Sequence, residues 1–480
     1  MDIDYREPRM NYLLKTSTIL VGVVLLLRAL LRSNLIILRN QLPSHLLHQP
    51  VHVQRNLLTP KVGKELLQLV ESIGTKNGYP TNVVDTSFYH TEHEHVGEAV
   101  PAVTEADGSV ICENPFLVPS VNRTLCLLAG RIDIGRHLIL TGGARGLREP
   151  YAKIISRVQS FGAYHFDLNA YPVVSRLFQE KEFLNTALKV CPANKRHLDP
   201  FQFNFIIQVP GQTVATHIDG VYFKGASRFQ FPQWLLAAMK FSGLWEDEFV
   251  DQVQVVGYLH QWQPKEDEEE TKTTKVKVVQ ESSMDTDQYG SFVYWNDENP
   301  IPKRVLPFPL SGNVVDGSKV VHAASVYRKD ADIPTIDKSI ANWLKKVKDE
   351  KDRWTLSNDR DGVFKNYTLN DLRISIVYRA RCFTTAEEAQ QFREQLHGEG
   401  GKDGRFTLEE ILNRFLNDLI QKGYYSKGTT LSMIPRLELA MKILKVYIKY
   451  PLPSTPTIPY NYCAASKLIP WLKGPLSLIC

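Results

Sequence analysis

The stretch from Phe203 to Asp219, FNFIIQVPGQTVATHID, decides how the rest of the chain is interpreted. Its first half is a run of Phe, Ile and Val, which favour β-strands, and the Pro-Gly-Gln that follows is typical of a turn. A second short strand then ends in His217-Ile-Asp219. Residues two apart in a strand point to the same face, so this imidazole and this carboxylate can bind one metal ion.

The His-x-Asp pattern is weak on its own, because other histidines of the chain also have an acidic residue two positions later. Those pairs are His90/Glu92, His165/Asp167, His197/Asp199 and His397/Glu399. Only the pair that begins at His217 follows both an apolar strand and a turn. This setting makes it the best candidate for a metal site.

A metal ion held by two ligands needs a third, and His322 can supply it. The pair Asp316-Gly317 predicts a tight turn, and the run SKVVHAASVY after it predicts a strand with His322 at its centre. A lone histidine in such a strand is more often a packed core residue, but its pairing with His217 and Asp219 favours a ligand. Two His and one carboxylate leave coordination positions open, as in non-haem Fe(II) oxygenases.

Strand-length runs rich in Phe, Ile, Val, Tyr and Trp follow from about residue 200 onward. The runs are 201–209, 253–260, 291–295, 313–315, 319–326 and 372–383. Gly, Pro and Asn separate them, and no regular helices alternate with them, which favours an antiparallel jelly roll. The expected fold class is therefore α+β, with a jelly-roll core and flanking helices.

Four regions are expected along the chain. They are 1–45 (tail and hydrophobic anchor), 46–195 (supporting α/β region), 196–384 (jelly-roll core) and 385–480 (helical region and Pro-rich tail). Two insertions interrupt the core, a charged run at 265–288 and residues 329–368, of which 339–354 is predicted to be helical. Helices are also predicted at 61–76 and 173–190, and in three runs after residue 384.

One segment near the N-terminus is more apolar than the rest. Residues 16–27 carry no charge, and the apolar character extends over residues 13–38. A helix of about 19 residues is about 28 Å long, close to a hydrocarbon core of about 30 Å. We expect a single-pass anchor, with the endoplasmic reticulum or Golgi favoured. A buried or interfacial amphipathic helix is the alternative.

The side of the membrane is left open by the sequence. Arginines lie on both sides of the apolar stretch, so the positive-inside rule gives no orientation. Asn122 and Asn366 begin glycosylation sequons, which would suit a lumenal body.

Composition excludes several classes of protein. Of 480 residues, 43% are hydrophobic and 23% are charged, which are globular values. The net charge of +5 is spread along the chain without a basic block, so nucleic-acid binding is not expected. Six Cys without a CxxC pair exclude a disulfide scaffold and make a Cys-built zinc site improbable. The redox compartment stays open.

Between residues 201 and 383 the chain resembles the Fe(II)- and 2-oxoglutarate-dependent dioxygenases, and among them the prolyl hydroxylases. The motifs that carry the resemblance are, in order, His217-Ile-Asp219, GYLHQW (257–262), GSFVYW (290–295), Asp316-Gly317 ahead of His322, and RISIVY (373–378). The resemblance implies a double-stranded β-helix, which is a form of jelly roll.

The resemblance also implies roles for six residues. In this family the HxD pair and a distal histidine bind the iron, which here are His217, Asp219 and His322. A basic residue in an Arg-x-Ser pattern pairs with the far carboxylate of 2-oxoglutarate, and Arg373 and Ser375 match that pattern. Tyr258 occupies the place of a tyrosine that often donates a hydrogen bond to the same carboxylate.

One departure from the family leaves alternatives for the carboxylate anchor. Arg373 lies 51 residues after His322, much farther than the family's basic residue usually does. Either an insertion separates the two strands, or Arg328 takes the role, with Arg379 as a third candidate. We favour Arg373 because RISIVY is a strong strand signal.

The function implied by the resemblance is oxidation with Fe(II), 2-oxoglutarate and O2, in some members supported by ascorbate as reductant. The substrate would be a peptidyl residue or a small molecule, hydroxylated with release of succinate and CO2. Two other interpretations keep the jelly roll. One is a catalytically inactive, membrane-tethered binding module, and the other is a zinc hydrolase or isomerase.

Overall fold

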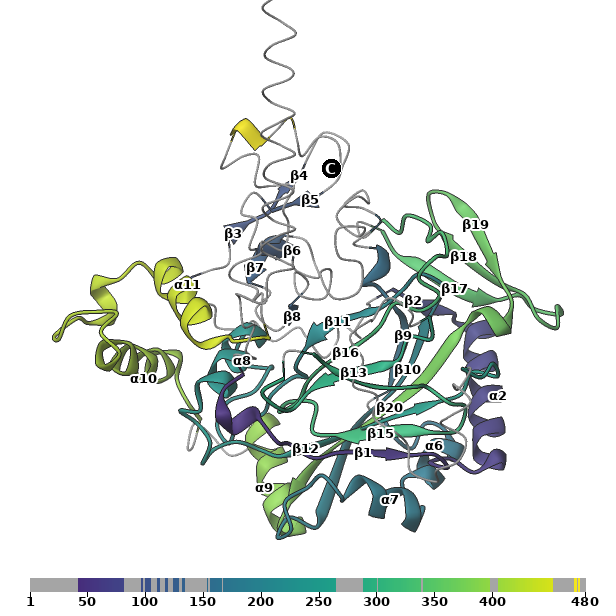
Figure 1. Ribbon diagram of the computed structural model, residues 1–480, viewed down its shortest axis with the longest axis horizontal. Coiled ribbons are helices and arrows are strands. Elements are labelled where there is room, and N and C mark those ends of the chain that lie inside the picture. Colours follow the sequence, from purple (N-terminus) through teal and green to yellow (C-terminus); the bar gives the residue numbers. More distant parts are fainter. Residues whose placement is uncertain are drawn as a thin grey trace, which may run out of the picture.

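The computed structural model describes most of the chain from residue 42 onward (Figure 1). The described residues are 42–81, 96–133 with short gaps, 153–165 without 154–155, 167–264, 288–337 without 300, 340–397, 405–451, 470–472 and 474. Residues 13–38, where an anchor is predicted, and most of the charged insertion lie outside them. Among the described helices, none is long and apolar enough to cross a membrane.

The centre of the molecule is a six-stranded antiparallel sheet. Its strands in spatial order are β1 (Val51–Gln54), β15 (Gly312–Val315), β12 (Gln252–Tyr258), β20 (Arg373–Phe383), β10 (His197–Gln208) and β9 (Phe161–His165). The long strands β10 and β20 pair over nearly their whole length, with Gln208 opposite Arg373 and His197 opposite Phe383.

One face of this sheet is apolar and is covered by helices. Alternate residues such as Phe203, Phe205 and Ile207 of β10 belong to a buried cluster with Ile374 and Ile376 of β20. The helices that complete this cluster are α2 (Pro60–Lys76), α6 (Pro172–Leu177) and α7 (Lys181–Ala187). Figure 1 shows them along one side of the sheet.

The opposite face of the same sheet is polar and nevertheless buried. Its side chains come from the alternate positions of four strands. They are Gln202, Asn204 and Gln208 of β10, Gln252, Gln254 and Tyr258 of β12, Asn313 of β15, and Arg373 and Ser375 of β20. Buried polar side chains need hydrogen-bond partners, so this face is a candidate surface for a bound ligand.

A five-stranded antiparallel sheet lies against this polar face. Its strands in order are β14 (Lys303–Val305), β13 (Phe292–Trp295), β16 (Val321–Ala324), β11 (Val214–His217) and β8 (Ile132–Asp133). At one end the two sheets meet through an apolar cluster that includes Phe292, Tyr294 and Val315. The outer face, with Val293 and Val321, packs against the helices of the C-terminal half.

The C-terminal helices appear where the sequence predicts them. They are α9 (Ala386–His397), α10 (Leu408–Gln421) and α11 (Arg436–Tyr447), and α11 packs on α8 (Gln233–Ser242). Thr407 caps α10 in a capping box with Glu410. All six predicted strand runs overlap strands of the two sheets, and the helix predicted at 61–76 is α2.

The helix predicted at 339–354 is wrong. Described residues of this segment form β17 (Asn342–Lys346), a turn and the start of β18 (Trp354–Asn358), which continue into β19 (Gly362–Tyr367). With β2 (Tyr79–Pro80) they make a separate four-stranded sheet. The hairpin lets Leu344 and Trp354 bury themselves in the cluster that contains α2, and this tertiary packing overrides local helix preference.

The single helix predicted at 173–190 is two helices, α6 and α7, with a break at Phe178–Glu180. The break lets two aromatic rings reach the sheet. Phe178 lies 4.9 Å and Phe183 5.3 Å from the Tyr378 ring, centroid to centroid.

The remaining described elements are short. They are η1 (Ser44–Leu46), β3 (Val100–Pro101), β4 (Val103–Thr104), β5 (Val110–Ile111), β6 (Leu117–Pro119), β7 (Leu125–Leu128), η5 (Leu369–Asp371), η6 (Leu431–Met433) and η8 (Pro470–Leu472). Of two disulfides, Cys112–Cys126 spans 14 residues and Cys191–Cys382 joins parts 191 residues apart in sequence. They are single cross-links on a large apolar core rather than a disulfide scaffold.

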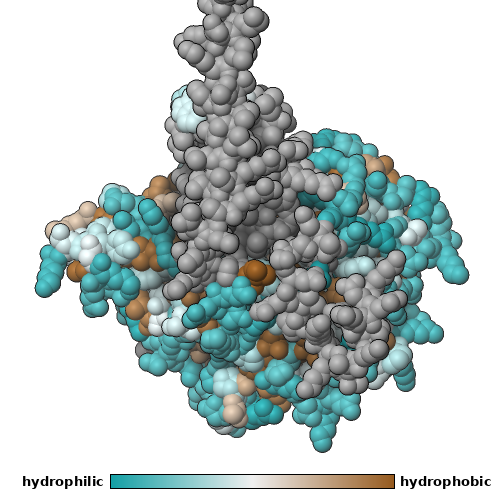
Figure 2. Space-filling view, viewed as in Figure 1, coloured by the Kyte–Doolittle hydropathy of each residue, from teal (hydrophilic) through white to brown (hydrophobic). Residues whose placement is uncertain are grey.

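The described surface is mostly hydrophilic in the view of Figure 2. Exposed large apolar side chains are scattered among the described elements rather than gathered. They include Val103, Ile301, Val363 and Met433.

Candidate metal centre

Three side chains with metal-binding atoms converge on the second sheet. His217 of β11 lies directly opposite His322 of β16 in the strand register, and their rings are 4.3 Å apart. Asp219 follows β11, and its Oδ1 lies 3.7 Å from His217 Nε2. One ligand atom from each of the three lies within 4.8 Å of the others, and no other such group occurs among the described residues.

Both imidazole rings are held by the backbone in the same way. Nδ1 of His217 lies 2.8 Å from the carbonyl oxygen of Ala215, and Nδ1 of His322 lies 2.8 Å from that of Val320. A ring that donates from Nδ1 to a carbonyl has its lone pair on Nε2, the tautomer a metal ion requires. Each ring is thus oriented by a carbonyl two residues earlier on its own strand.

The electrostatics of the site favour ligation. Burial, followed by the neighbouring His217, lowers the pKa of His322 to about 3, so this ring is neutral near pH 7. Burial alone would raise the pKa of Asp219, but Arg379 and the two imidazoles outweigh it and hold that pKa below its ordinary value. The site therefore presents neutral imidazole and an ionised carboxylate, the forms that bind divalent metals.

Asp219 is fixed from two directions. Arg379 Nη2 donates to Asp219 Oδ1 at 2.8 Å, and the Asp219 amide donates to the carbonyl of Gly317 at 2.8 Å. A Cβ on Gly317 would overlap Asp219 Oδ2 and lie 2.6 Å from Gln254 Oε1. Only glycine lets this turn approach the carboxylate so closely.

The residues predicted to bind 2-oxoglutarate also lie together, on the polar face of the six-stranded sheet. Tyr258 is opposite Ser375 in the register, and the Arg373 guanidinium carbon is 5.1 Å from the centroid of the Tyr258 ring. Arg373 Nη1 donates to Gln208 Oε1 at 2.7 Å, and Asn313 Nδ2 donates to the Tyr258 hydroxyl at 2.8 Å. Burial raises the pKa of Tyr258, so its hydroxyl keeps its proton.

The three arginines considered as the carboxylate anchor occupy different environments. Arg373 is 4% exposed on the polar inner face. The Arg328 side chain is 40% exposed and pairs with Asp371 at 2.7 Å, on the outside. Arg379 shares the face of Arg373 but lies six residues, about 20 Å, along the strand and pairs with Asp219. The geometry favours Arg373.

The amide side chains of the polar face are not among the residues predicted from the sequence. Several of their buried polar atoms have no hydrogen-bond partner: Asn204 Oδ1, Gln208 Nε2, Gln254 Oε1 and Asn313 Oδ1. Asp219 Oδ2 is a further one. Native interiors rarely leave such atoms unpaired, so the space between the sheets fits a polar ligand and a metal ion. The alternation Gln202-x-Asn204 and Gln252-x-Gln254 was the available signal.

A column of aromatic rings closes the Arg373 end of the polar face. The rings of His260 and Trp262 stack at 3.8 Å, and those of Trp262 and Tyr327 at 5.1 Å. Gly290 lies beside Arg373, where a Cβ would be 2.8 Å from Arg373 Cδ. Burial and then the Arg373 charge lower the pKa of His260 to about 3, so this ring is neutral.

Comparisons with known proteins give one kind of match. No family model and no curated protein matches the chain. Among solved structures it is similar to a prolyl-4-hydroxylase of Pseudomonas putida, with 10% identity, 70% of this chain and 93% of the other covered, and a TM-score of 0.29. A second similar structure is a Trichoplax adhaerens prolyl hydroxylase in complex with a hypoxia-inducible-factor peptide. It has 10% identity, covers 72% of this chain and 87% of the other, and has a TM-score of 0.27.

A third similar structure is HygX of Streptomyces hygroscopicus with nickel and 2-oxoglutarate bound, with 10% identity, coverage of 46% and 69%, and a TM-score of 0.22. A Burkholderia pseudomallei oxidoreductase of the 2OG-Fe(II) oxygenase family is also similar, with 8% identity, coverage of 46% and 66%, and a TM-score of 0.22, and this is the superfamily that the sequence resembles. At these TM-scores the likeness carries no argument for function, which rests on the residues described above.

Proposed function

We propose that this chain is an Fe(II)- and 2-oxoglutarate-dependent dioxygenase that hydroxylates a peptidyl residue or a small molecule. The observation that supports it most strongly is the convergence of His217, Asp219 and His322 on one sheet, facing a buried polar sheet that carries Arg373. We further propose that the two sheets are the halves of a double-stranded β-helix.

In this proposal His217, Asp219 and His322 hold the metal. When bound, Fe(II) with 2-oxoglutarate and O2 supplies the oxidising chemistry, in which succinate and CO2 are released and one oxygen atom enters the substrate. The protein contributes binding, orientation and the exclusion of water. Two of those contributions can be assigned to residues.

Orientation of the cosubstrate is assigned to the Arg373 end. A guanidinium held by Gln208 and packed on Tyr258 is a fixed fork, which suits a carboxylate better than a mobile ammonium would. The Tyr258 hydroxyl accepts from Asn313, which leaves its proton available for the carboxylate. Ser375 Oγ lies 3.3 Å from the Ile206 carbonyl beside them.

Exclusion of water is assigned to the aromatic column. His260, Trp262 and Tyr327 stack at the end of the sheet, and Trp262 Nε1 is anchored to the carbonyl of Leu372 at 3.1 Å. A dry environment strengthens the pairing of Arg373 with a carboxylate. The column therefore supports tight binding of the cosubstrate.

An oxidising compartment is part of the proposal. Cys112–Cys126 and Cys191–Cys382 are at disulfide distance, and such bonds persist in the secretory pathway rather than the cytosol. This supports the predicted endomembrane location, with residues 13–38 as the anchor. Thiol labelling of the cell-derived protein before and after reduction tests it: four protected thiols are expected, and labelling of all thiols without reductant would exclude it.

The activity is tested with the purified chain under anaerobic conditions. Addition of Fe(II) and 2-oxoglutarate should give the weak visible charge-transfer band expected of a chelated ferrous centre, and admission of O2 should then yield succinate without added substrate. Ascorbate should prolong turnover. An Asp219→Ala variant is the control and should show neither signal. Absence of both in the parent chain would favour the binding module, and tight zinc binding without succinate would favour a hydrolase or isomerase.

A further inference from the structure

A tight turn between β15 and β16 contacts one candidate metal ligand directly and a second through the residue that follows the turn. It comprises residues 316–319, and its Gly317 carbonyl accepts the Asp219 amide at 2.8 Å. The Asp316 carbonyl accepts the amides of Lys319 and Val320, each at 3.0 Å, and the Val320 carbonyl in turn orients the His322 ring. A shift of this turn would move both ligands together.

The turn is held by a carboxylate inside it. Asp316 Oδ1 accepts from the Ser318 amide at 3.0 Å and the Ser318 hydroxyl at 2.5 Å, and Asp316 Oδ2 accepts from the Gln252 amide at 3.0 Å. The last bond ties the turn to β12 of the six-stranded sheet. Asp316 is 2% exposed, so these bonds are made out of water, where each is stronger.

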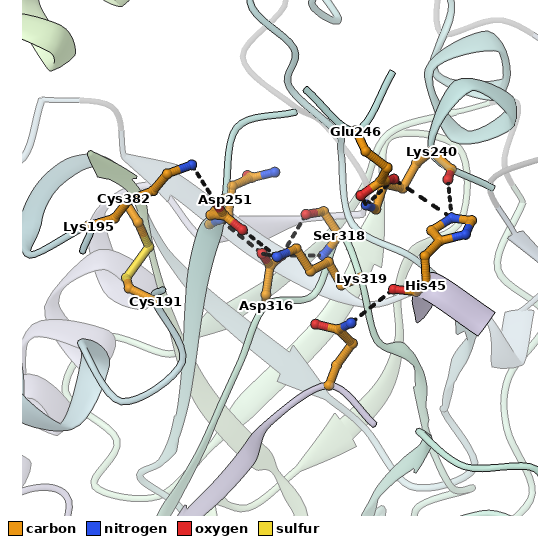
Figure 3. Close-up of polar contacts among 12 residues, drawn as sticks. His45, Cys191, Lys195, Lys240, Glu246, Asp251, Asp316, Ser318, Lys319 and Cys382 are labelled. Carbon is orange, nitrogen blue, oxygen red and sulfur yellow. Dashed lines mark hydrogen bonds and ion pairs between the residues drawn. A yellow bond between two sulfur atoms is a disulfide. The ribbon is translucent and has the colours of Figure 1, made fainter. Parts of the chain in front are cut away.

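A buried ion network continues from the turn to the ends of the central strands of the six-stranded sheet (Figure 3). Lys319 Nζ donates to Asp251 Oδ1 and lies 3.9 Å from Asp316 Oδ2. Lys195 Nζ donates to the other oxygen of Asp251, Oδ2, at 2.6 Å. Two lysines and two aspartates make the network neutral as a whole.

The network ends at a disulfide. The Cys382 amide donates to the Asp251 carbonyl at 2.8 Å, and Cys382 is bonded to Cys191, four residues before Lys195. The covalent bond thus keeps Lys195 and Asp251 next to each other at the end of β20. Figure 3 shows the disulfide beside this ion pair.

We infer that Asp251, with Lys195 and Lys319, is a positioning group for the metal centre, which the Cys191–Cys382 bond supports from outside the site. This inference rests on the proposed metal site but not on the reaction. Asp251 is 6% exposed and satisfies two ammonium groups, so its neutralisation leaves buried positive charge uncompensated beside the turn. The turn then loses its fixed place, and Asp219 and His322 lose theirs.

A matched control lies nearby. Lys240, 1% exposed, is paired with Glu246 at 2.7 Å, and among the described residues this pair makes no hydrogen bond to the turn. Its Nζ contacts one side of the Phe249 ring, and Lys319 lies 5.0 Å from the same ring. The Glu246 side chain is 42% exposed and acts on Lys319 only through space, so Glu246→Gln removes an ion pair but none of the hydrogen bonds that hold the turn.

The test measures metal binding rather than turnover. The parent chain, Asp251→Asn and Glu246→Gln are titrated anaerobically with Co(II) in the absence of cosubstrate, and affinity and the visible Co(II) spectrum are recorded beside the thermal unfolding midpoint. We expect Asp251→Asn to bind Co(II) about 10-fold more weakly with an altered spectrum, as for groups that orient metal ligands. Glu246→Gln should lower the unfolding midpoint but leave both metal readouts unchanged.

Two outcomes would overturn the inference: unchanged Co(II) affinity and spectrum in Asp251→Asn, or an equal loss in Glu246→Gln. If Asp251→Asn does not fold, Lys195→Met, which removes a partly exposed partner, should weaken Co(II) about 3-fold. Normal Co(II) binding by that folded variant would overturn the inference as well. A parent chain that binds no Co(II) would instead contradict the metal site itself.

Discussion

The two ends of the buried polar face share strand β20 but differ in what they position. At one end a loop and two facing strands bring ligand atoms to a point, and at the other a single arginine is enclosed by amides and rings. Each end has one glycine against its central charged group, Gly317 against Asp219 and Gly290 against Arg373. Mutations at the first end should therefore change metal binding, and mutations at the second end should change cosubstrate binding.

The largest effect is expected from Gly317→Ala. Its new Cβ would overlap Asp219 Oδ2, so the carboxylate must turn away from the imidazoles. We expect Co(II) affinity to fall by about 100-fold, the upper end for groups that orient ligands. Calorimetric titration with Co(II) measures it. A loss below about 3-fold would show that the carboxylate has room to adjust.

The matching effect at the other end is expected from Arg373→Met. Loss of a charge-assisted pair costs about 1.5–3 kcal/mol, so 2-oxoglutarate should bind about 10–100-fold more weakly. Metal affinity should stay within about 2-fold, since Arg373 lies about 20 Å along β20 from Arg379, the residue that pairs with Asp219. Arg328→Met is the control and should change neither affinity. A larger loss of 2-oxoglutarate affinity in Arg328→Met than in Arg373→Met would refute Arg373 as the anchor.

Gly290→Ala should give a smaller and equally selective effect. Gly290 has φ of +66°, and a Cβ there would lie 2.8 Å from Arg373 Cδ. Displacement of the guanidinium and backbone strain of about 1–2 kcal/mol predict about 10-fold weaker 2-oxoglutarate binding. Equilibrium titration of 2-oxoglutarate in the presence of Co(II) checks this, and Gly362→Ala, with φ of +66° but open space around it, controls for strain alone.

The last prediction concerns the pH dependence of stability rather than ligand affinity, and it tests the aromatic column. The pKa of His260 is lowered to about 3 by burial and Arg373, so this ring takes up a proton only when the chain unfolds. The free energy of unfolding should therefore fall as pH drops from about 6.5 towards 3, by up to about 1.4 kcal/mol per pH unit from this residue.

Urea unfolding of the metal-free chain at several pH values tests the assignment. In His260→Gln the free energy of unfolding should change less steeply with pH, because about one proton fewer is taken up on unfolding. An unchanged dependence would mean that the ring is protonated in the folded chain.

The convergence of His217, Asp219 and His322 could be predicted from sequence because its signals are local. His217-Ile-Asp219 follows a strand and a turn, and His322 lies in a strand after a second turn, so alternation alone places them on sheet faces. RISIVY similarly identified β20 and the inner position of Arg373. These predictions use the period of a strand, which tertiary structure rarely changes.

Partners across strands could not be predicted. Gln208, Asn313 and Arg379 acquire their roles from register, which brings together residues between 55 and 165 positions apart. Arg379 was considered for the cosubstrate, but the structure pairs it with Asp219. The false helix at 339–354 has the same cause, since Trp354 packs against α2 at Gly74, far away in sequence.

Alternate residues of strand β20, which point to the same side of the sheet, reach both ends of the polar face. Arg373 and Ser375 lie at one end and Arg379 at the other, while Ile374, Ile376 and Tyr378 face the helices. Inserting or deleting one residue between 374 and 378 would send one set of arginines into the helix-covered layer. Variation in the length of this strand is thus confined to even steps.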